Sequence, residues 1–189
     1  MILLSILEML GTIAFAASGA LTGIQKGLDL FGILCLSITT SIGGGLIRDV
    51  LLNNLPPVAL KNPLYCIIAI IVTIFTCIFH KKIVRISKVI LIVDAIGLGV
   101  FTALGANTAL QKGADTLYTV IFAAVITGIG GGILRDVFVK DIPYVFRKEI
   151  YAVASMIGAF ILYYTYNYFP HVISLCICFI ITFTVRLIA

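Results

Sequence analysis

Long apolar segments alternate with short polar connections along the whole chain. The apolar segments cover about residues 2–22, 30–52, 64–79, 89–110, 116–139, 150–168 and 172–189. The hydrocarbon core of a bilayer is ~30 Å thick, and a helix needs ~20 apolar residues to cross it. Pro56, Pro57, Pro63 and Pro170 lie in the connections, where proline disfavours continuation of a helix. The pattern predicts seven transmembrane helices.

The composition supports an integral membrane protein. The 189 residues are 61% hydrophobic and 11% charged, and the mean hydropathy is +1.20. A soluble domain of this length needs far more polar surface. We therefore expect an all-α membrane domain over residues 1–189 that contacts lipid. The first apolar segment has no basic residues before it and no processing site after it, which favours a retained helix over a signal peptide.

The net charge of +5 is better explained by membrane topology than by nucleic-acid binding, because the basic residues lie mainly in the helix connections. With the N-terminus outside, ten of the 13 basic residues fall on the inner side and three on the outer side. The inner set is Lys26, Lys81, Lys82, Arg85, Lys88, Arg135, Lys140, Arg147, Lys148 and Arg186, and the outer set is Arg48, Lys61 and Lys112. The positive-inside rule then predicts a plasma-membrane protein with an external N-terminus and a cytoplasmic C-terminus.

The two halves of the chain repeat each other. Glu8, Gly11, Phe15 and Gly19 match Asp94, Gly97, Phe101 and Gly105 at an offset of 86 residues, and positions after the first triple glycine match at 87. The predicted repeats are residues 2–80 and 88–169, with an extra helix at 171–189. Each repeat has three helices, an odd number, so the second copy must enter the membrane from the opposite side. This pattern predicts an inverted 3+3 repeat plus one C-terminal helix.

A triple glycine followed by an arginine–aspartate pair lies in the second and fifth predicted helices. The two motifs are Gly43-Gly44-Gly45 with Arg48 and Asp49, and Gly130-Gly131-Gly132 with Arg135 and Asp136. Glycine inside a helix costs ~1 kcal/mol relative to alanine. The glycines either permit close helix contact, or kink or interrupt the helices so that polar backbone groups line a path. The nearby charges favour the second interpretation.

Three hydroxyl side chains, Thr40, Ser41 and Thr127, precede the glycines. They can ligate a dehydrated cation or a polar substrate, or bond back to carbonyls of their own helix. Both interpretations stay open for each of them.

Charged side chains within the apolar segments are expected to pair, since an unpaired charge at membrane depth is costly. Depth along the helices predicts Glu8–Arg48 and Asp94–Arg135 ion pairs near opposite membrane surfaces. Two further options across the repeats are Lys112–Asp49 and Lys26–Asp136. These pairs either hold helices together or gate the two ends of an ion path, and both roles can hold at once.

No combination of residues in the sequence indicates an enzyme, because no nucleophile with an adjacent histidine, phosphate loop or metal-ligand cluster is present. The five cysteines lie in or beside apolar segments without a Cys-x-x-Cys, as small buried hydrophobes do. We expect no metal or cofactor apart from a permeant K⁺ or Na⁺. The aromatic residues of the sixth segment, Tyr151 among them, are interpreted as membrane-interface and packing residues.

The chain resembles the prokaryotic trimeric intracellular cation (TRIC) channel family, whose bacterial sequences are also labelled glycine-transporter domains. The resemblance lies in Gly11 to Ala20, in the Lys26 to Gly32 turn and in both Gly-Gly-Gly-x-x-Arg-Asp motifs. It implies seven helices, a homotrimer, and a pore inside each protomer formed largely by the kinked second and fifth helices. It also implies conduction of monovalent cations, with K⁺ favoured.

Three functional hypotheses follow. The first is a passive cation channel, with the glycines at the kink and the hydroxyl and charged residues above lining or gating the path. The second is a secondary transporter of a small solute such as glycine, which would bind the solute carboxylate at a half-helix N-terminus. The third is a non-conducting membrane scaffold, with straight helices and no polar path.

Overall fold

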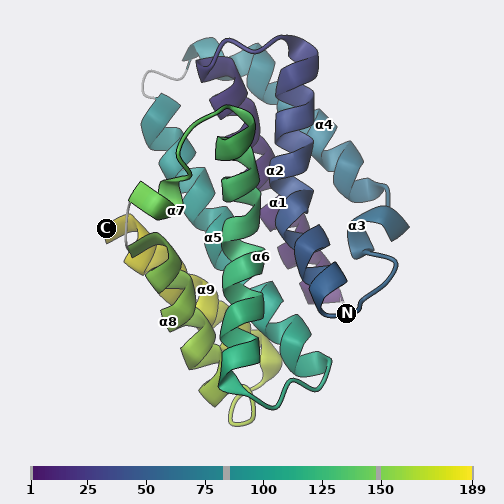
Figure 1. Ribbon diagram of the computed structural model, residues 1–189, viewed down its shortest axis with the longest axis vertical. Coiled ribbons are helices and arrows are strands. Elements are labelled where there is room, and N and C mark those ends of the chain that lie inside the picture. The colour runs from purple at the N-terminus through teal and green to yellow at the C-terminus, as the bar shows by residue number, and fades with distance from the viewer. Residues whose placement is uncertain (1, 83–85, 148–149, 189) are drawn as a thin grey trace.

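The computed structural model describes residues 2–82, 86–147 and 150–188, and these segments are helical with short connections (Figure 1). The helices are α1 (Ile2–Gln25), α2 (Leu30–Leu51), α3 (Val58–Lys61), α4 (Leu64–Phe79), the 3-10 helix η1 (His80–Lys82), α5 (Ile86–Gln111), α6 (Leu117–Phe138), α7 (Tyr144–Arg147), α8 (Ile150–Thr165) and α9 (His171–Ile188). Each predicted apolar segment therefore lies mainly on one helix.

Five of the described helices, α1, α2, α5, α6 and α9, are long and apolar enough to cross a membrane. The other two apolar helices, α4 and α8, have 16 residues each, which at 1.5 Å per residue corresponds to about 24 Å. The α8 helix ends at Thr165, three residues before the predicted end at 168. The protein is thus a multi-pass, all-helical membrane protein.

Matched turns connect the first two helices of each half. The turn after α1 has Gly27 at φ +69°, and the turn after α5 has Gly113 at φ +83°, a backbone region in which a side chain is strained. Each following helix has a side-chain cap: Asp29 accepts a hydrogen bond from the Gly32 amide at the start of α2, and Thr116 accepts one from the Thr119 amide at the start of α6. These turns fix where α2 and α6 begin.

The helices α1, α2, α5 and α6 pack together in the centre, with α4 against α1 and α2, and α8 and α9 against α5. In Figure 1, α2 descends while α6 ascends, and α4 lies on the opposite side from α8 and α9. The matched residues Phe15 of α1 and Phe101 of α5 stack in the core, with ring centroids 5.2 Å apart. The central four helices therefore position the glycine motifs inside the protein.

Candidate functional site

The triple glycines bring the backbones of α2 and α6 into direct contact. A Cβ atom on Gly44 would overlap the backbone oxygen of Thr127, and one on Gly131 would overlap that of Thr40. A Cβ on Gly130 would lie 3.1 Å from the Gly44 Cα. Only residues without a side chain permit this approach, so close helix contact accounts for the central glycines.

An interrupted helix at the glycines, one form of the second interpretation, is wrong for this structure. Both α2 and α6 are helical without a break from Leu30 to Leu51 and from Leu117 to Phe138. The physical reason is that a continuous helix keeps its backbone groups hydrogen-bonded at membrane depth, while glycine still permits the close approach. A bend within a continuous helix stays a prediction.

The predicted hydroxyl side chains bond back to their own helices. Thr40 donates to the Leu36 carbonyl at 2.6 Å and Ser41 to the Ile38 carbonyl at 3.0 Å. In α6, Thr127 donates to the Ala123 carbonyl at 2.5 Å. Such bonds satisfy a buried hydroxyl without a ligand, and only Ser41 of the three also lines a cavity described below.

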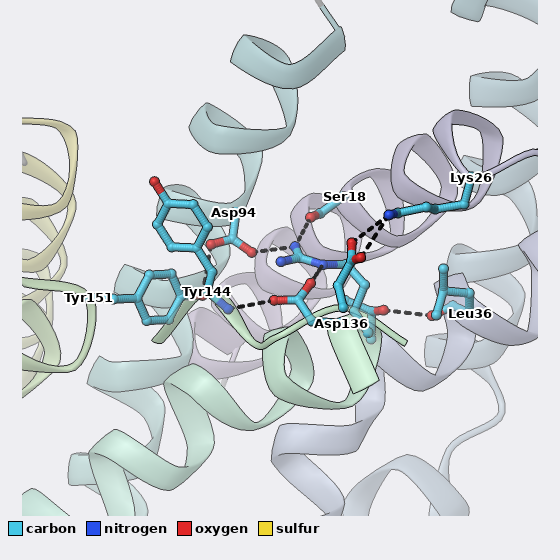
Figure 2. Close-up of polar contacts among 10 residues, drawn as sticks. Ser18, Lys26, Leu36, Asp94, Asp136, Tyr144 and Tyr151 are labelled. Atoms are coloured by element: carbon cyan, nitrogen blue, oxygen red, sulfur yellow. Dashed lines mark hydrogen bonds and ion pairs between the residues drawn. The ribbon is translucent and has the colours of Figure 1, made fainter. Parts of the chain in front are cut away.

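One buried ionic cluster surrounds Arg135 (Figure 2). Its Nη1 lies 2.6 Å from Asp94 Oδ1 and donates to Ser18 Oγ, and its Nε donates to Asp136 Oδ1 at 2.8 Å. Tyr151 donates to the other Asp94 oxygen at 2.7 Å. The predicted Asp94–Arg135 pair is confirmed, and each of its charges has hydrogen-bond partners, as buried ions require.

A second arginine joins this cluster from α9. The Arg186 guanidinium lies over the rings of Tyr144 and Tyr151, 4.7 Å from each centroid, and the residue is 3% exposed. Arg186 thus contacts the cluster through two tyrosine rings, while Arg135 pairs with Asp94 and Asp136. From the sequence, Arg186 served only to predict the membrane topology, because a lone arginine near a helix end gives no signal of what it packs against.

Of the two roles expected for Tyr151, packing is confirmed and contact with the membrane interface is wrong, because it is a buried structural residue of the ion pair. It is 2% exposed, because its hydroxyl points inward to Asp94. A signal for this contact was present in the sequence: Tyr65 and Tyr151 are separated by the same 86 residues as Glu8 and Asp94.

The matched cluster around Arg48 is looser. Arg48 Nη2 lies 2.9 Å from Asp49 Oδ1 and 3.8 Å from Glu8 Oε1, and Tyr65 donates to the other Glu8 oxygen at 2.5 Å. The predicted Glu8–Arg48 pair is confirmed as an ion pair, although the Glu8 side chain is 19% exposed. The position that matches Ser18 here is Leu104, which cannot accept a hydrogen bond from the arginine.

Asp49 and Asp136 tie their helices to the connection that follows. Asp49 Oδ2 accepts from the Val58 amide, and Asp136 Oδ2 accepts from the Tyr144 amide, both at 2.8 Å. Since the adjacent arginine occupies the other oxygen of each, these carboxylates are not free for a lysine.

The two cross-repeat pairs are accordingly not found in the described part of the chain. Lys26 forms its ion pair at 2.7 Å with Asp141 instead of Asp136, because Asp136 is already held by Arg135 and Tyr144. Lys112 forms no ion pair with Asp49 among the described residues, because Arg48, Asn54 and Val58 surround that carboxylate.

Two cavities meet at Glu8 and Arg48. A cavity of about 30 Å³ reaches α2 and is lined by Glu8, Thr12, Ser41, Gly45, Arg48 and Tyr65, with other residues. A second cavity of about 190 Å³ is lined by Glu8, Arg48, Asn54, Asn107 and Lys112, with other residues. A space of ~10–15 Å³ holds one water molecule, so both accept water or an ion with a reduced hydration shell. Among the described residues no group of three His, Cys, Asp or Glu side chains could hold a metal ion.

A bundle of membrane-length helices with buried arginine–carboxylate pairs on either side of a glycine crossing defines a multi-pass membrane protein with a polar interior. The sequence model of the family described as "Glycine transporter" matches the chain twice, over residues 5–81 and 91–167. Together with the relatives and structures below, this match shows that the chain belongs to the family of the prokaryotic TRIC channels.

Two relatives illustrate the sequence similarity. The chain is 39% identical over 165 residues to the UPF0126 inner membrane protein YadS of Escherichia coli strain K12, covering 85% of this chain and 79% of YadS. It is 39% identical over 157 residues to the UPF0126 membrane protein YvgT of Bacillus subtilis strain 168, covering 82% and 77%. Homologues are thus named membrane proteins in distant bacteria.

Two solved structures share the whole fold. A crystal structure of a prokaryotic TRIC channel in 0.5 M KCl superimposes with a TM-score of 0.95 at 41% identity, covering 99% of this chain and 95% of that chain. The trimeric intracellular cation channel orthologue from Rhodobacter sphaeroides has a TM-score of 0.94 at 31% identity, covering 100% and 97%. The structural neighbours are therefore cation channels.

Proposed function

We propose that the protein is a passive channel for monovalent cations, with K⁺ favoured, and that each protomer holds its own pore. The observation that carries this proposal is the cavity beside α2, in a chain of the TRIC family. Its wall combines a carboxylate, Glu8, with the Ser41 hydroxyl and the bare helix backbone at Gly45. Oxygen ligands and the absence of a side chain favour passage of a small cation. Conduction of this kind needs neither a cofactor nor an enzymatic step.

We further propose that α1, α2, α4, α5, α6, α8 and α9 cross the plasma membrane as an inverted 3+3 repeat plus one helix. The family model matches twice with its start points 86 residues apart, and α2 and α6 run in opposite directions (Figure 1). The lysine and arginine distribution favours an external N-terminus and a cytoplasmic C-terminus. The Rhodobacter sphaeroides orthologue is described as a trimeric channel, which supports a homotrimer for this protein.

In this proposal the two arginine clusters mark the ends of the path, and the α2–α6 crossing forms its narrow centre. Arg48, Asp49 and Glu8 flank the external cavity, and Arg135, Asp136 and Asp94 hold the cytoplasmic end. The glycines at the crossing keep α2 and α6 close enough to share the wall of the path, with or without a bend.

The test is cation flux in liposomes that contain the purified full-length protein, with Gly45→Leu as the blocking variant. A Cβ on Gly45 meets only Arg48 Nη2, at 3.9 Å, so the larger side chain enters the cavity while the helix crossing is kept. Gly45→Ala is the matched control, because it adds one methyl group at the same site. We expect potential-driven K⁺ flux that rises linearly with concentration in the wild type and the control, and a loss of most of it in Gly45→Leu.

A second arm with radiolabelled glycine tests the carrier hypothesis, which the description of the family model suggests. Saturable glycine uptake without a K⁺ current would refute the channel proposal. K⁺ flux that persists unchanged in a folded Gly45→Leu protein would refute the proposed path.

A further inference from the structure

The two ends of the protein differ at matched positions. At one end Lys26 Nζ lies 2.7 Å from Asp141 Oδ2 and 2.8 Å from Oδ1. Lys26 follows α1 and Asp141 follows α6, so the ion pair bridges the two halves of the chain. The matched residues at the other end, at offsets of 86 and 87, are Lys112 and Asn54. An amide carries no charge, so this end cannot form the same ion pair.

At the end without the pair, the matched residues line a cavity. The paired end has a cavity of about 220 Å³ elsewhere, which is lined by Leu28, Phe138 and neighbouring residues of α2 but not by Lys26 or Asp141. Lys112 and Asn54 both line the space of about 190 Å³, and Glu8 and Arg48 line it with them. Lys112 and Asn54 thus border a cavity, whereas their counterparts Lys26 and Asp141 form an ion pair.

Three further matched positions differ between the two ends. Tyr144 replaces the cavity-lining Val58, and its ring packs on Arg186. Ser18 replaces Leu104 and bonds Arg135. Leu21, which is 2% exposed, replaces the polar Asn107. Each change makes the paired end bulkier, more tightly bonded or less polar than its counterpart.

We propose that the Lys26–Asp141 pair is the gate of the cytoplasmic end, and that the structure is closed at this end and open at the other. This proposal rests on the proposed channel function and names its regulation. The pair joins the α1–α2 turn, which carries Lys26 (labelled in Figure 2), to the connection after α6. That connection can move away from α1 only when the pair breaks. Both side chains are 38% exposed, and water and ions compete for such a pair, so it opens readily.

The repeat supplies the variants for the test. Asp141→Asn places at the paired end the asparagine that the open end has at the matched position, Asn54. Lys26→Gln removes the positive charge of the ion pair. An exposed ion pair changes an equilibrium constant by about 1.5- to 5-fold, and we expect both variants to raise K⁺ flux in liposomes by that factor. The exchange Lys26→Asp with Asp141→Lys should restore wild-type flux.

Charge alone cannot produce this set of results, because Asp141→Asn adds one positive charge and Lys26→Gln removes one. If these two variants change K⁺ flux in opposite directions, or leave it equal to that of the wild type, the gate is refuted.

Backbone hydrogen exchange of residues 139–142 gives a readout that does not depend on conduction. We expect faster exchange in Asp141→Asn than in the wild type and the charge-exchanged protein. Unchanged exchange would refute the gate. If the wild type shows no K⁺ flux but the exchange difference between it and Asp141→Asn is present, the channel function is refuted. The conclusion that the pair closes this end would still hold.

Discussion

The contact between α2 and α6 predicts different effects on stability for alanine at two adjacent glycines. A Cβ on Gly44 would overlap the Thr127 backbone oxygen, whereas a Cβ on Gly45 meets its nearest atom, Arg48 Nη2, at 3.9 Å. Both variants gain about 1 kcal/mol of helix propensity. Forcing extra volume into a packed contact costs about 1–3 kcal/mol. Because the propensity gain cancels, Gly44→Ala should be less stable than Gly45→Ala by about 1–3 kcal/mol.

Gly131→Ala tests the same crossing from the other helix, because its Cβ would overlap the Thr40 backbone oxygen. We expect Gly44→Ala with Gly131→Ala to cost less than the sum of the two single variants, since one separation of α2 from α6 relieves both overlaps.

Equilibrium unfolding in detergent micelles, followed by far-ultraviolet circular dichroism, measures these differences. The chain contains no tryptophan, so the helix signal is the natural probe. Equal unfolding free energies for Gly44→Ala and Gly45→Ala would show that the two helices do not touch at Gly44, and the explanation of the central glycines would fail.

Two further predictions use the same unfolding measurement. Tyr151→Phe removes a hydrogen bond from the buried Asp94 carboxylate and should cost about 1.5–3 kcal/mol, whereas Tyr65→Phe should cost less because water can reach Glu8; an equal or larger cost for Tyr65→Phe would contradict the role of burial. Arg186→Met removes a desolvated cation from two tyrosine rings and should cost about 2 kcal/mol, with Arg186→Lys intermediate; wild-type stability of Arg186→Met would show that the stacking is unimportant.

The helical membrane fold could be predicted because the apolar segments are long and their connections polar. The Glu8–Arg48 and Asp94–Arg135 pairs could be predicted as well, because a buried charge must be compensated and helix depth follows from residue number. Both pairs are present, at 3.8 Å and 2.6 Å.

Contacts that depend on the rotation of a helix could not be predicted. Counting residues gives the depth of Lys26 but not the neighbouring carboxylate it faces, and Asp141 lies only five residues beyond the expected Asp136. The role of the glycines was also ambiguous, because the sequence alone does not distinguish a close contact between two helix backbones from an interruption of the helix. The roles of Arg186 and Tyr151 needed the packing of α9 and α8 against the cluster.

Asp49 and Asp136 each anchor the connection that follows their helix, and this affects where the chain tolerates a change of length. Asp49 reaches the amide of the ninth residue after it, and Asp136 that of the eighth, at the same distance of 2.8 Å. The two connections therefore differ by one residue between fixed anchors, and Pro56-Pro57 stand where the second half has Pro143 alone. In this stretch the first half already carries one residue more than the second half. We therefore expect a single reporter residue inserted there to leave both arginine clusters in position.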